Sequence, residues 1–259
     1  MRPDILLPGD TFRDAPRAPV MVAVARGRFV MGARNNDPAA EADERPPHAV
    51  TITHALAVSQ SAVSFAEWDA AAAQGAFGSF VPGDSGWGRL ERPVINVSWR
   101  DAQAFCSHLS RETGRRYRLL SEAEWEYCCR AGGDGVYPGG AAPSAETANF
   151  DATYGFGDGR PALARDKTTP GRSFPANAFG LFDMVGQVWE WVEDAYHSSY
   201  EAAPADGAAR RLGDGEGHRV VRGGSWASDL RSLRASQRGS WDPDERNNVL
   251  GFRVACDLA

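Results

Sequence analysis

The segment from residue 133 to about residue 176 constrains the fold most. It is rich in glycine, proline and alanine, and it shows neither helical nor strand periodicity. An irregular stretch of that length inside a compact domain needs something to hold it, such as a metal ion, aromatic packing or a partner. The chain has 28 glycines, 16 prolines and eight tryptophans among 259 residues, which indicates a loop-rich but ordered interior. We therefore expect ordered loops set among short strands and a few helices.

Three predicted helices begin with the same signature, a serine followed three positions later by an acid. The serine hydroxyl accepts from free backbone amides of the first turn, and the acid reaches back to the serine amide. The glutamate pairs fit this capping box, and the shorter aspartate is a weaker match. The pairs are Ser64 and Glu67, Ser98 and Asp101, and Ser121 and Glu124.

Short apolar runs predict the strands. Residues 21–32 indicate two strands around a turn at Gly27, and residues 50–53 and 57–59 follow. In the Trp-Glu-Trp run at 189–191, an extended backbone places both indoles on one face and Glu190 on the other. Residues 218–226 and 249–256 are predicted strands that bracket a polar loop. Since no repeat or linker interrupts the pattern, we predict one α+β domain over residues 1–259.

Charge and hydropathy exclude some partners. The net charge is −6 and no dense basic run occurs, so we expect no nucleic-acid partner. No stretch reaches the ~20 apolar residues of a membrane helix, so we expect no membrane partner. The apolar run at the start is too short for a signal peptide, although a signal already removed would leave the same start. The compartment therefore stays open, cytoplasmic by default.

Six segments, taken in order, resemble the formylglycine-generating-enzyme (sulfatase-modifying factor) family. They span roughly residues 20–256, and the match is specific because six blocks keep their order. The resemblance implies a C-type-lectin-like α+β fold with short mixed strands, few helices and much irregular backbone. The segments are Phe-Val-Met-Gly at 29–32, Pro-Val-Ile-Asn-Val-Ser-Trp at 93–99, Arg-Leu-Leu-Ser-Glu-Ala-Glu-Trp-Glu-Tyr at 118–127, the run at 177–191 ending in Trp-Glu-Trp, Arg-Gly-Gly-Ser-Trp at 222–226, and Gly-Phe-Arg at 251–253.

The resemblance also shows that the pair of copper-binding cysteines is missing from this sequence. Family members that oxidise a substrate cysteine bind copper through two cysteine thiolates shortly after Gly-Gly-Ser, and soft sulfur ligands favour Cu(I). In this sequence Ser228 and Leu230 stand in that region. We therefore expect no copper and no formylglycine-generating oxidase activity, which makes the chain a candidate pseudoenzyme. His48 and His54 are a weaker alternative metal pair.

The family's usual disulfide joins the helix around Cys106 to the last strand. The exact terminal position here is Val254, but Cys256 lies two residues further on and faces the same side of a strand. The resemblance thus implies a Cys106–Cys256 bridge, which would indicate an extracytoplasmic protein. Four reduced, buried thiols in a cytoplasmic protein are the alternative.

Calcium is the metal that the resemblance implies for the irregular middle. The first set would be Asn149, the Phe150 carbonyl and either Asp166 or Asp158. The second would include Glu190, with Gln187 in place of the family's asparagine. Calcium accepts carbonyl and carboxylate oxygens in flexible geometry, which suits such loops. The alternative is that Asn149 and Glu190 satisfy buried backbone amides instead.

Our leading functional hypothesis is a binding protein for a peptide, protein or small molecule. Tryptophan and arginine are enriched at interface hot spots, and both gather in the C-terminal polar stretch. A solvated loop whose charges pair among themselves is the alternative. The predicted binding surface comprises Trp226, Ser228, Asp229, Arg231, Arg234, Arg238, Trp241, Asp242, Arg246, Asn247 and Asn248.

Two other functions stay open. Some relatives without the cysteine pair act in natural-product maturation, so a variant oxidoreductase that matures a peptide or a siderophore-type product is the alternative. Ser225, Ser228 and Arg231 lie in the expected groove, but no general base stands beside them in the sequence. A domain that restrains a kinase or sulfatase partner is the third hypothesis.

Overall fold

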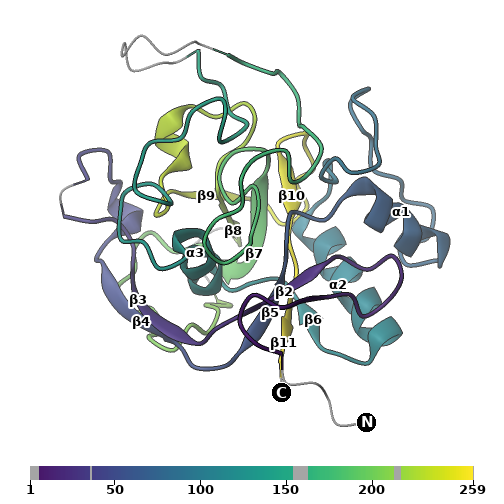
Figure 1. Cartoon of the computed structure of the whole chain (residues 1–259), viewed down its shortest axis with the longest axis horizontal. Coiled ribbons are helices and arrows are strands. Elements are labelled where there is room, and N and C mark those ends of the chain that lie inside the picture. The colour runs from purple at the N-terminus through teal and green to yellow at the C-terminus, as the bar shows by residue number, and fades with distance from the viewer. Residues whose placement is uncertain (1–5, 36, 154–162, 213–216, 259) are drawn as a thin grey trace.

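The structure is a computed structural model that describes residues 6–35, 37–153, 163–212 and 217–258 (Figure 1). One sheet joins the two ends of the chain in the order β1-β2-β5-β11-β6, and every pairing in it is antiparallel. Its strands are β1 (Thr11–Phe12), β2 (Met21–Val24), β5 (Leu56–Ser59), β11 (Ala255–Asp257) and β6 (Tyr117–Arg118).

A second sheet runs in the order β10-β7-β8-β9, with β10 parallel to β7 and the other pairs antiparallel. A separate two-stranded sheet pairs β3 with β4. The strands of these two sheets are β10 (Leu250–Phe252), β7 (Trp189–Ala195), β8 (Arg219–Arg222), β9 (Arg238–Trp241), β3 (Gly27–Met31) and β4 (His48–Ile52).

The three predicted helix starts are confirmed. Helix α1 (Phe65–Ala73), α2 (Trp99–Thr113) and α3 (Glu122–Arg130) each begin with a complete capping box, including the aspartate case at Ser98. In Figure 1, α1 and α2 lie together on one side of the sheets, whereas α3 lies among the loops in front of β7 and β8. Two short 3-10 helices, η1 (Ala42–Glu44) and η2 (Leu230–Leu233), complete the helical elements of the described residues.

All nine residues of α3 are buried, although four of them carry charged side chains. Its alternating glutamates each meet an arginine from elsewhere: Glu122 binds Arg238, Glu124 binds Arg118, and Glu126 binds Arg222. Buried carboxylates are tolerated only with such partners. The Arg118-to-Tyr127 family motif therefore builds the interior of the domain.

The strand predictions need three corrections. Strands β2 and β3 do form, but they belong to different sheets, and Gly27 begins β3 where a turn was predicted. A Cβ there would meet the Tyr127 hydroxyl at 2.3 Å, so Gly27 permits close packing. The polar loop predicted between 226 and 249 contains η2 and the edge strand β9, whose Arg-Gly-Ser-Trp sequence has little strand signal.

The long loops are confirmed: within the described parts of residues 133–176 there is no helix or strand. Backbone bonds tie them to distant segments, from Ala235 N to the Val136 carbonyl and from Asp151 N to the Ser228 carbonyl. Phe150 and Leu233 pack in a small apolar cluster between the loop and η2. Packing of this kind supplies the support that the sequence required. No helix in the part of the chain that the structure describes is long and apolar enough to span a membrane.

Candidate functional site

The region after β8 lies where the resemblance predicted the reactive groove. Gly223 has φ +99°, and a Cβ there would lie 3.0 Å from both the Met184 carbonyl and the Trp125 ring. Only glycine combines that backbone with that close approach. The chain then turns so that the Ser225 and Ser228 hydroxyls lie 3.1 Å apart, and Ser225 N donates to Ser228 Oγ at 3.0 Å. The serine pair thus closes its own loop.

No thiol lies on this loop, and the four thiols elsewhere are buried. Leu230, in the position expected for a copper ligand, packs against the apolar cluster around Phe150. Burial raises the pKa of the Cys129 thiol to about 12 and that of the Cys106 thiol further still, so both stay protonated at neutral pH.

The predicted Cys106–Cys256 disulfide is not present, because all four cysteines are free. Both sulfur atoms lie in the same apolar cluster, but Cys256 Sγ is directed to the Asp257 carbonyl at 3.6 Å. Burial raises the pKa of the Cys256 thiol to about 11. Cys256 therefore lies in the same apolar cluster as Cys106, but the two cysteines are not bonded.

Two half-buried tryptophans form an aromatic corner beside the serine loop. The rings of Trp87 and Trp226 meet edge to face at 5.2 Å. Trp226 is held by its backbone N, which donates to the Gln187 carbonyl, and by its indole N–H, which donates to the Asn248 carbonyl at 3.0 Å. Two other segments therefore fix Trp226, against which Trp87 packs; we call this pair the Trp87–Trp226 corner. Sequence reasoning missed Trp87, because nothing in its Gly-rich loop links it to the C-terminal stretch.

Two arginines of the predicted binding surface are buried, and their assignment to it was wrong. Arg234 is 2% exposed and binds Asp37 and Glu44, and Arg238 is 4% exposed and binds Glu122. Their partners lie more than 100 residues away in the sequence, so no local pattern reveals them. Both arginines fasten the strand and loop to the interior.

The other members of that surface are exposed or half-buried, but several have structural contacts. Asp229 accepts from Ser232 N and caps η2. Trp241 packs edge to face on Trp189, and Arg246 binds Asp101 with two hydrogen bonds. The members that stay exposed are Arg231, Asp242 and Arg246, and those half-buried are Trp226, Ser228, Asp229, Trp241, Asn247 and Asn248.

The first predicted calcium set has one feature that fits a cation. Asn149 is 1% exposed, and its Oδ1 has no hydrogen-bond partner among the described residues. Its Nδ2 donates to the Lys167 carbonyl at 2.9 Å, which places Thr168 nearby. The buried Thr168 Oγ1 also lacks a partner in the described part of the chain, and the exposed Asp166 precedes it by two residues. Buried oxygens without a partner, such as Asn149 Oδ1 and Thr168 Oγ1, are of the hard kind that calcium prefers.

The second predicted set does not fit. Both carboxylate oxygens of Glu190 are occupied, one by Trp125 Nε1 and Arg253 Nε and the other by Arg253 Nη2. Gln187 Oε1 accepts from Asn149 and Thr169, and its Nε2 donates to Thr169. Every side-chain oxygen of this pair therefore already accepts a hydrogen bond from the protein.

Among the described residues, no group of three or more His, Cys, Asp or Glu side chains is arranged to hold a metal ion. Asp158, the alternative acid of the first set, lies outside the described residues. His48 and His54 do not face one another. His48 Nδ1 lies near the Pro46 carbonyl, and His54 Nε2 lies 3.1 Å from Glu124.

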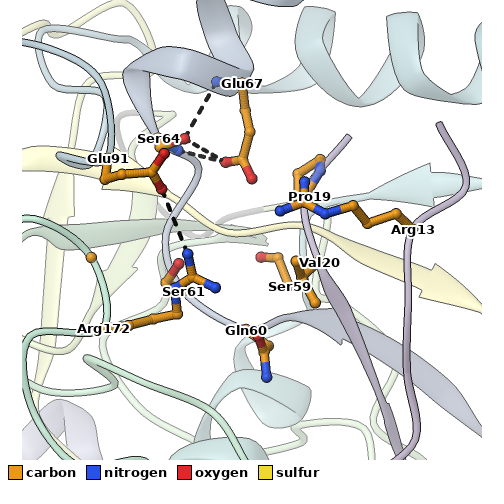
Figure 2. Close-up of a pocket in the computed structure, with 11 residues that line it drawn as sticks. Arg13, Pro19, Val20, Ser59, Gln60, Ser61, Ser64, Glu67, Glu91 and Arg172 are labelled. Carbon is orange, nitrogen blue, oxygen red and sulfur yellow. Dashed lines mark hydrogen bonds and ion pairs between the residues drawn. The ribbon is translucent and has the colours of Figure 1, made fainter. Parts of the chain in front are cut away.

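A polar cavity of about 10 Å³ lies between the β5–α1 connection and the loop around Arg172 (Figure 2). Figure 2 shows the Glu67 carboxylate turned toward its centre, with one oxygen bonded to Ser64. Burial raises the pKa of Glu67, and the nearby Arg13 opposes that rise. A space of this size holds about one water molecule, so it does not serve as an organic-ligand site.

His54 belongs to an ionic cluster at the first turn of α3. Its hydrogen bond to Glu124 raises the pKa of His54. Burial alone would raise the pKa of Glu124, but hydrogen bonds from His54 and Arg118 outweigh it and bring that pKa to about 2. Arg118 also binds Asp257 on β11 at 2.6 Å. Protonated His54 therefore strengthens the link between α3 and the last strand.

This cluster predicts a pH dependence. Since the pKa of His54 is higher in the folded state, its contribution is complete below the unfolded value of about 6.5 and is lost as pH rises through the folded value. We expect His54→Gln to reduce the free energy of unfolding by less than about 1 kcal/mol, because the ring is partly exposed and screened. Urea unfolding from pH 5.5 to 8.5 should show this difference shrinking as pH rises. A difference that grows with pH would contradict the assignment.

Comparisons with known proteins agree with this architecture. The model of the sulfatase-modifying factor enzyme 1-like domain matches residues 9–258. PvdO from Pseudomonas aeruginosa is 35% identical, with a TM-score of 0.85, and the match covers 97% of this chain and 99% of that one. The inactive C-alpha-formylglycine-generating enzyme 2 of Bos taurus is 36% identical over 185 residues, which are 67% of this chain and 53% of that protein. The serine/threonine-protein kinase Pkn1 of Chlamydia trachomatis is 34% identical over 173 residues, 66% of this chain and 25% of the kinase.

The chain belongs to the formylglycine-generating-enzyme (sulfatase-modifying factor) family. Its α+β fold is the fold of that family, as the ordered motifs predicted. The chain spans between a quarter and about half of the length of the curated relatives that it matches.

Proposed function

We propose that this chain is a binding member of its family that recognises a peptide, protein or small molecule at the Trp87–Trp226 corner. The carrying observation is the perpendicular indole pair, half-buried, with Trp226 fixed by the Gln187 and Asn248 carbonyls from two other segments. Tryptophan dominates interface hot spots, and an aromatic surface already held in place loses little entropy on binding. The serine loop beside it brings hydroxyls where copper-binding relatives bring thiolates.

The rim of this surface is smaller than the sequence indicated. With Arg234 and Arg238 inside the protein, the exposed charge beside the corner comes from Arg231 and the 242–246 turn. Arg246 is partly neutralised by Asp101. The two buried arginines therefore do not contribute to the charge of this surface.

A random 12-residue peptide library displayed on phage tests this proposal, with the purified domain as bait. We expect enriched sequences to bind the wild type and to lose at least tenfold in affinity with Trp226→Ala or Trp87→Ala, because each removes half of the corner. Affinities of synthetic peptides are measured by fluorescence polarisation. Trp241→Ala is the matched control, since that indole packs on Trp189 instead. Peptides that bind the Trp226 variant as well as the wild type would refute the site.

A second function is favoured by one observation, the match to PvdO over nearly the full length of both chains. A variant oxidoreductase that matures a peptide or siderophore-type product would be consistent with such a relative. Metal analysis by mass spectrometry of the purified protein, with a free-thiol count, separates the two functions. Stoichiometric copper or iron would favour oxidation, and neither metal with four titratable thiols would favour binding.

Calcium is the cofactor that we propose for the loop at Asn149. Asn149, Thr168, Asp166 and the Phe150 carbonyl would hold the ion, and the ion would fix the long loop against the domain. We expect the melting temperature to rise when calcium is added to chelator-treated protein, since a ligand present at 100 times its Kd contributes about 2.7 kcal/mol. Asn149→Ala should remove most of that rise, whereas Asp151→Ala, a nearby exposed-loop change, should retain it. An unchanged response in Asn149→Ala would exclude the site.

A further inference from the structure

A concave surface of about 530 Å³ lies at the first turn of α3, within the size range of small-molecule sites. We call it the His54 groove, because His54, between β4 and β5, lines it. The 207–211 loop and β7 line it as well, together with Arg116 beside β6. No residue of the Trp87–Trp226 corner is among those that line it. An occupant of this groove would therefore be additional to the ligand proposed for the corner.

Two arginines on the walls of the His54 groove have unused donors that a ligand can reach. The Arg116 side chain is 68% exposed, and its only contact among the described residues is with Asp257 at 3.4 Å. The Arg211 side chain is 66% exposed, and its Nε lies 3.6 Å from Glu193 Oε1, too far for a hydrogen bond. Since a guanidinium group carries five N–H donors, most donors of both arginines remain available within the described part of the chain.

The carboxylates of the groove are more fully engaged. Both oxygens of Glu124 accept hydrogen bonds from Arg118. One oxygen of Asp257 accepts two more from Arg118, and one oxygen of Glu193 accepts from Gln103. The second oxygens of Asp257 and Glu193 are those that face the two exposed arginines. The hydrogen-bonding capacity left for a ligand is therefore mainly that of a donor.

We propose that the His54 groove binds a small organic anion, whose carboxylate or phosphate group accepts hydrogen bonds from Arg116 and Arg211. Guanidinium groups match both kinds of oxyanion, and such charge-assisted hydrogen bonds are stronger than those between neutral groups. Ala208, Ala209 and the alkyl stems of the arginines line the same groove and accommodate the apolar body of the ligand. The charged group distinguishes this ligand from a neutral molecule of the same shape.

His54 makes this binding depend on pH. Its ring is 41% exposed, and its Nε2 lies 3.1 Å from Glu124. The hydrogen bond to Glu124 raises the pKa of His54, Asp257 adds to the rise, and burial and Arg118 oppose it. Protonated His54 adds a positive charge to the groove, so the affinity for an anion is highest at acidic pH and falls as His54 loses its proton. A neutral ligand has no such dependence.

Isothermal titration with benzoate, phenyl phosphate and the neutral benzyl alcohol tests the proposal on the whole chain. At pH 6.0 we expect benzoate to bind at least ten times more tightly than benzyl alcohol. Benzoate stays ionised up to pH 8.5, where we expect its affinity to be at least threefold lower because His54 is neutral. The tighter binder of the two anions identifies carboxylate or phosphate as the preferred group. Equal affinities of benzoate and benzyl alcohol, or no saturable binding of either anion, would overturn the proposal.

Two single variants locate the anion. Arg116→Ala and Arg211→Ala should each weaken the binding of the preferred anion at least fivefold, since each removes one exposed guanidinium from the groove. Arg28→Ala is the matched control, because Arg28 is an exposed arginine on β3 that does not line the groove. If the two groove variants bound the anion as tightly as Arg28→Ala, the site would lie elsewhere and the proposal would be wrong.

A third variant should strengthen binding, and a gain of affinity cannot result from a failure to fold. Glu193→Gln removes the negative charge that faces Arg211 and keeps an oxygen to accept from Gln103. We expect the anion to bind Glu193→Gln at least three times more tightly than the wild type. Unchanged or weaker binding would show that Arg211 does not contact the anion and would refute the proposed arrangement.

Discussion

Replacement of Arg238 by methionine is expected to lower the free energy of unfolding by about 3–5 kcal/mol, the usual cost of breaking a buried ion pair from one side. Arg238 is 4% exposed and donates to both oxygens of Glu122, and its guanidinium also lies over the Tyr200 ring at 4.5 Å. Methionine fills part of the space but leaves Glu122 buried with a reduced set of cations. Urea unfolding at pH 7 measures the loss.

Arg246→Met is the matched control for this experiment. Arg246 lies in the same C-terminal stretch and forms an equally well aligned pair with Asp101, but its side chain is 42% exposed. A pair that water screens contributes less than about 1 kcal/mol. If Arg238→Met cost no more than Arg246→Met, Arg238 would belong on the binding surface, as the sequence had suggested.

Glu190→Gln is expected to lower the free energy of unfolding by a similar amount, about 3–5 kcal/mol, because it leaves Arg253 as an unpaired cation in the interior. Both residues are at most 1% exposed, and the pair also binds the Trp125 indole N–H at 2.7 Å. We expect the loss to be equal in excess calcium and in chelator, since both Glu190 oxygens already accept hydrogen bonds within the protein. The measurement is again urea unfolding, under both conditions.

Comparing the stability of Glu190→Gln in calcium and in chelator decides whether Glu190 is a calcium ligand. Calcium at the Asn149 loop would stabilise wild type and Glu190→Gln to the same extent. A variant that no longer responds to calcium would show that Glu190 is a ligand after all. Gln187→Ala is the companion change, expected to lower stability without removing the calcium response.

The fold was accessible from the sequence because its signals are local or carried by motif order. The capping serines predicted the starts of all three helices, and the six ordered segments identified the family fold. Strand β9 was missed because its pairing with β8 depends on contacts that its own residues do not display. Gly27 was assigned to a turn because the Tyr127 side chain that excludes any larger residue is 100 positions away.

The site was less accessible for the same reason. The sequence does not distinguish an arginine that faces water from one that binds a carboxylate far away in the chain. Arg234 and Arg238 were therefore predicted to be exposed, although both are buried. Trp87 was missed because its partner Trp226 is remote in the sequence.

Strand β11 lies inside its sheet, between β5 and β6, although it is the last strand in the described chain. On a ribosome, β5 and β6 therefore emerge long before the strand that joins them, and the sheet stays divided until residue 257 has left the exit tunnel. Folding of this domain must then finish after residue 257 is made, and long-range pairing of this kind is slow. Until that moment, the open edges of β5 and β6 are surfaces that a chaperone has reason to cover.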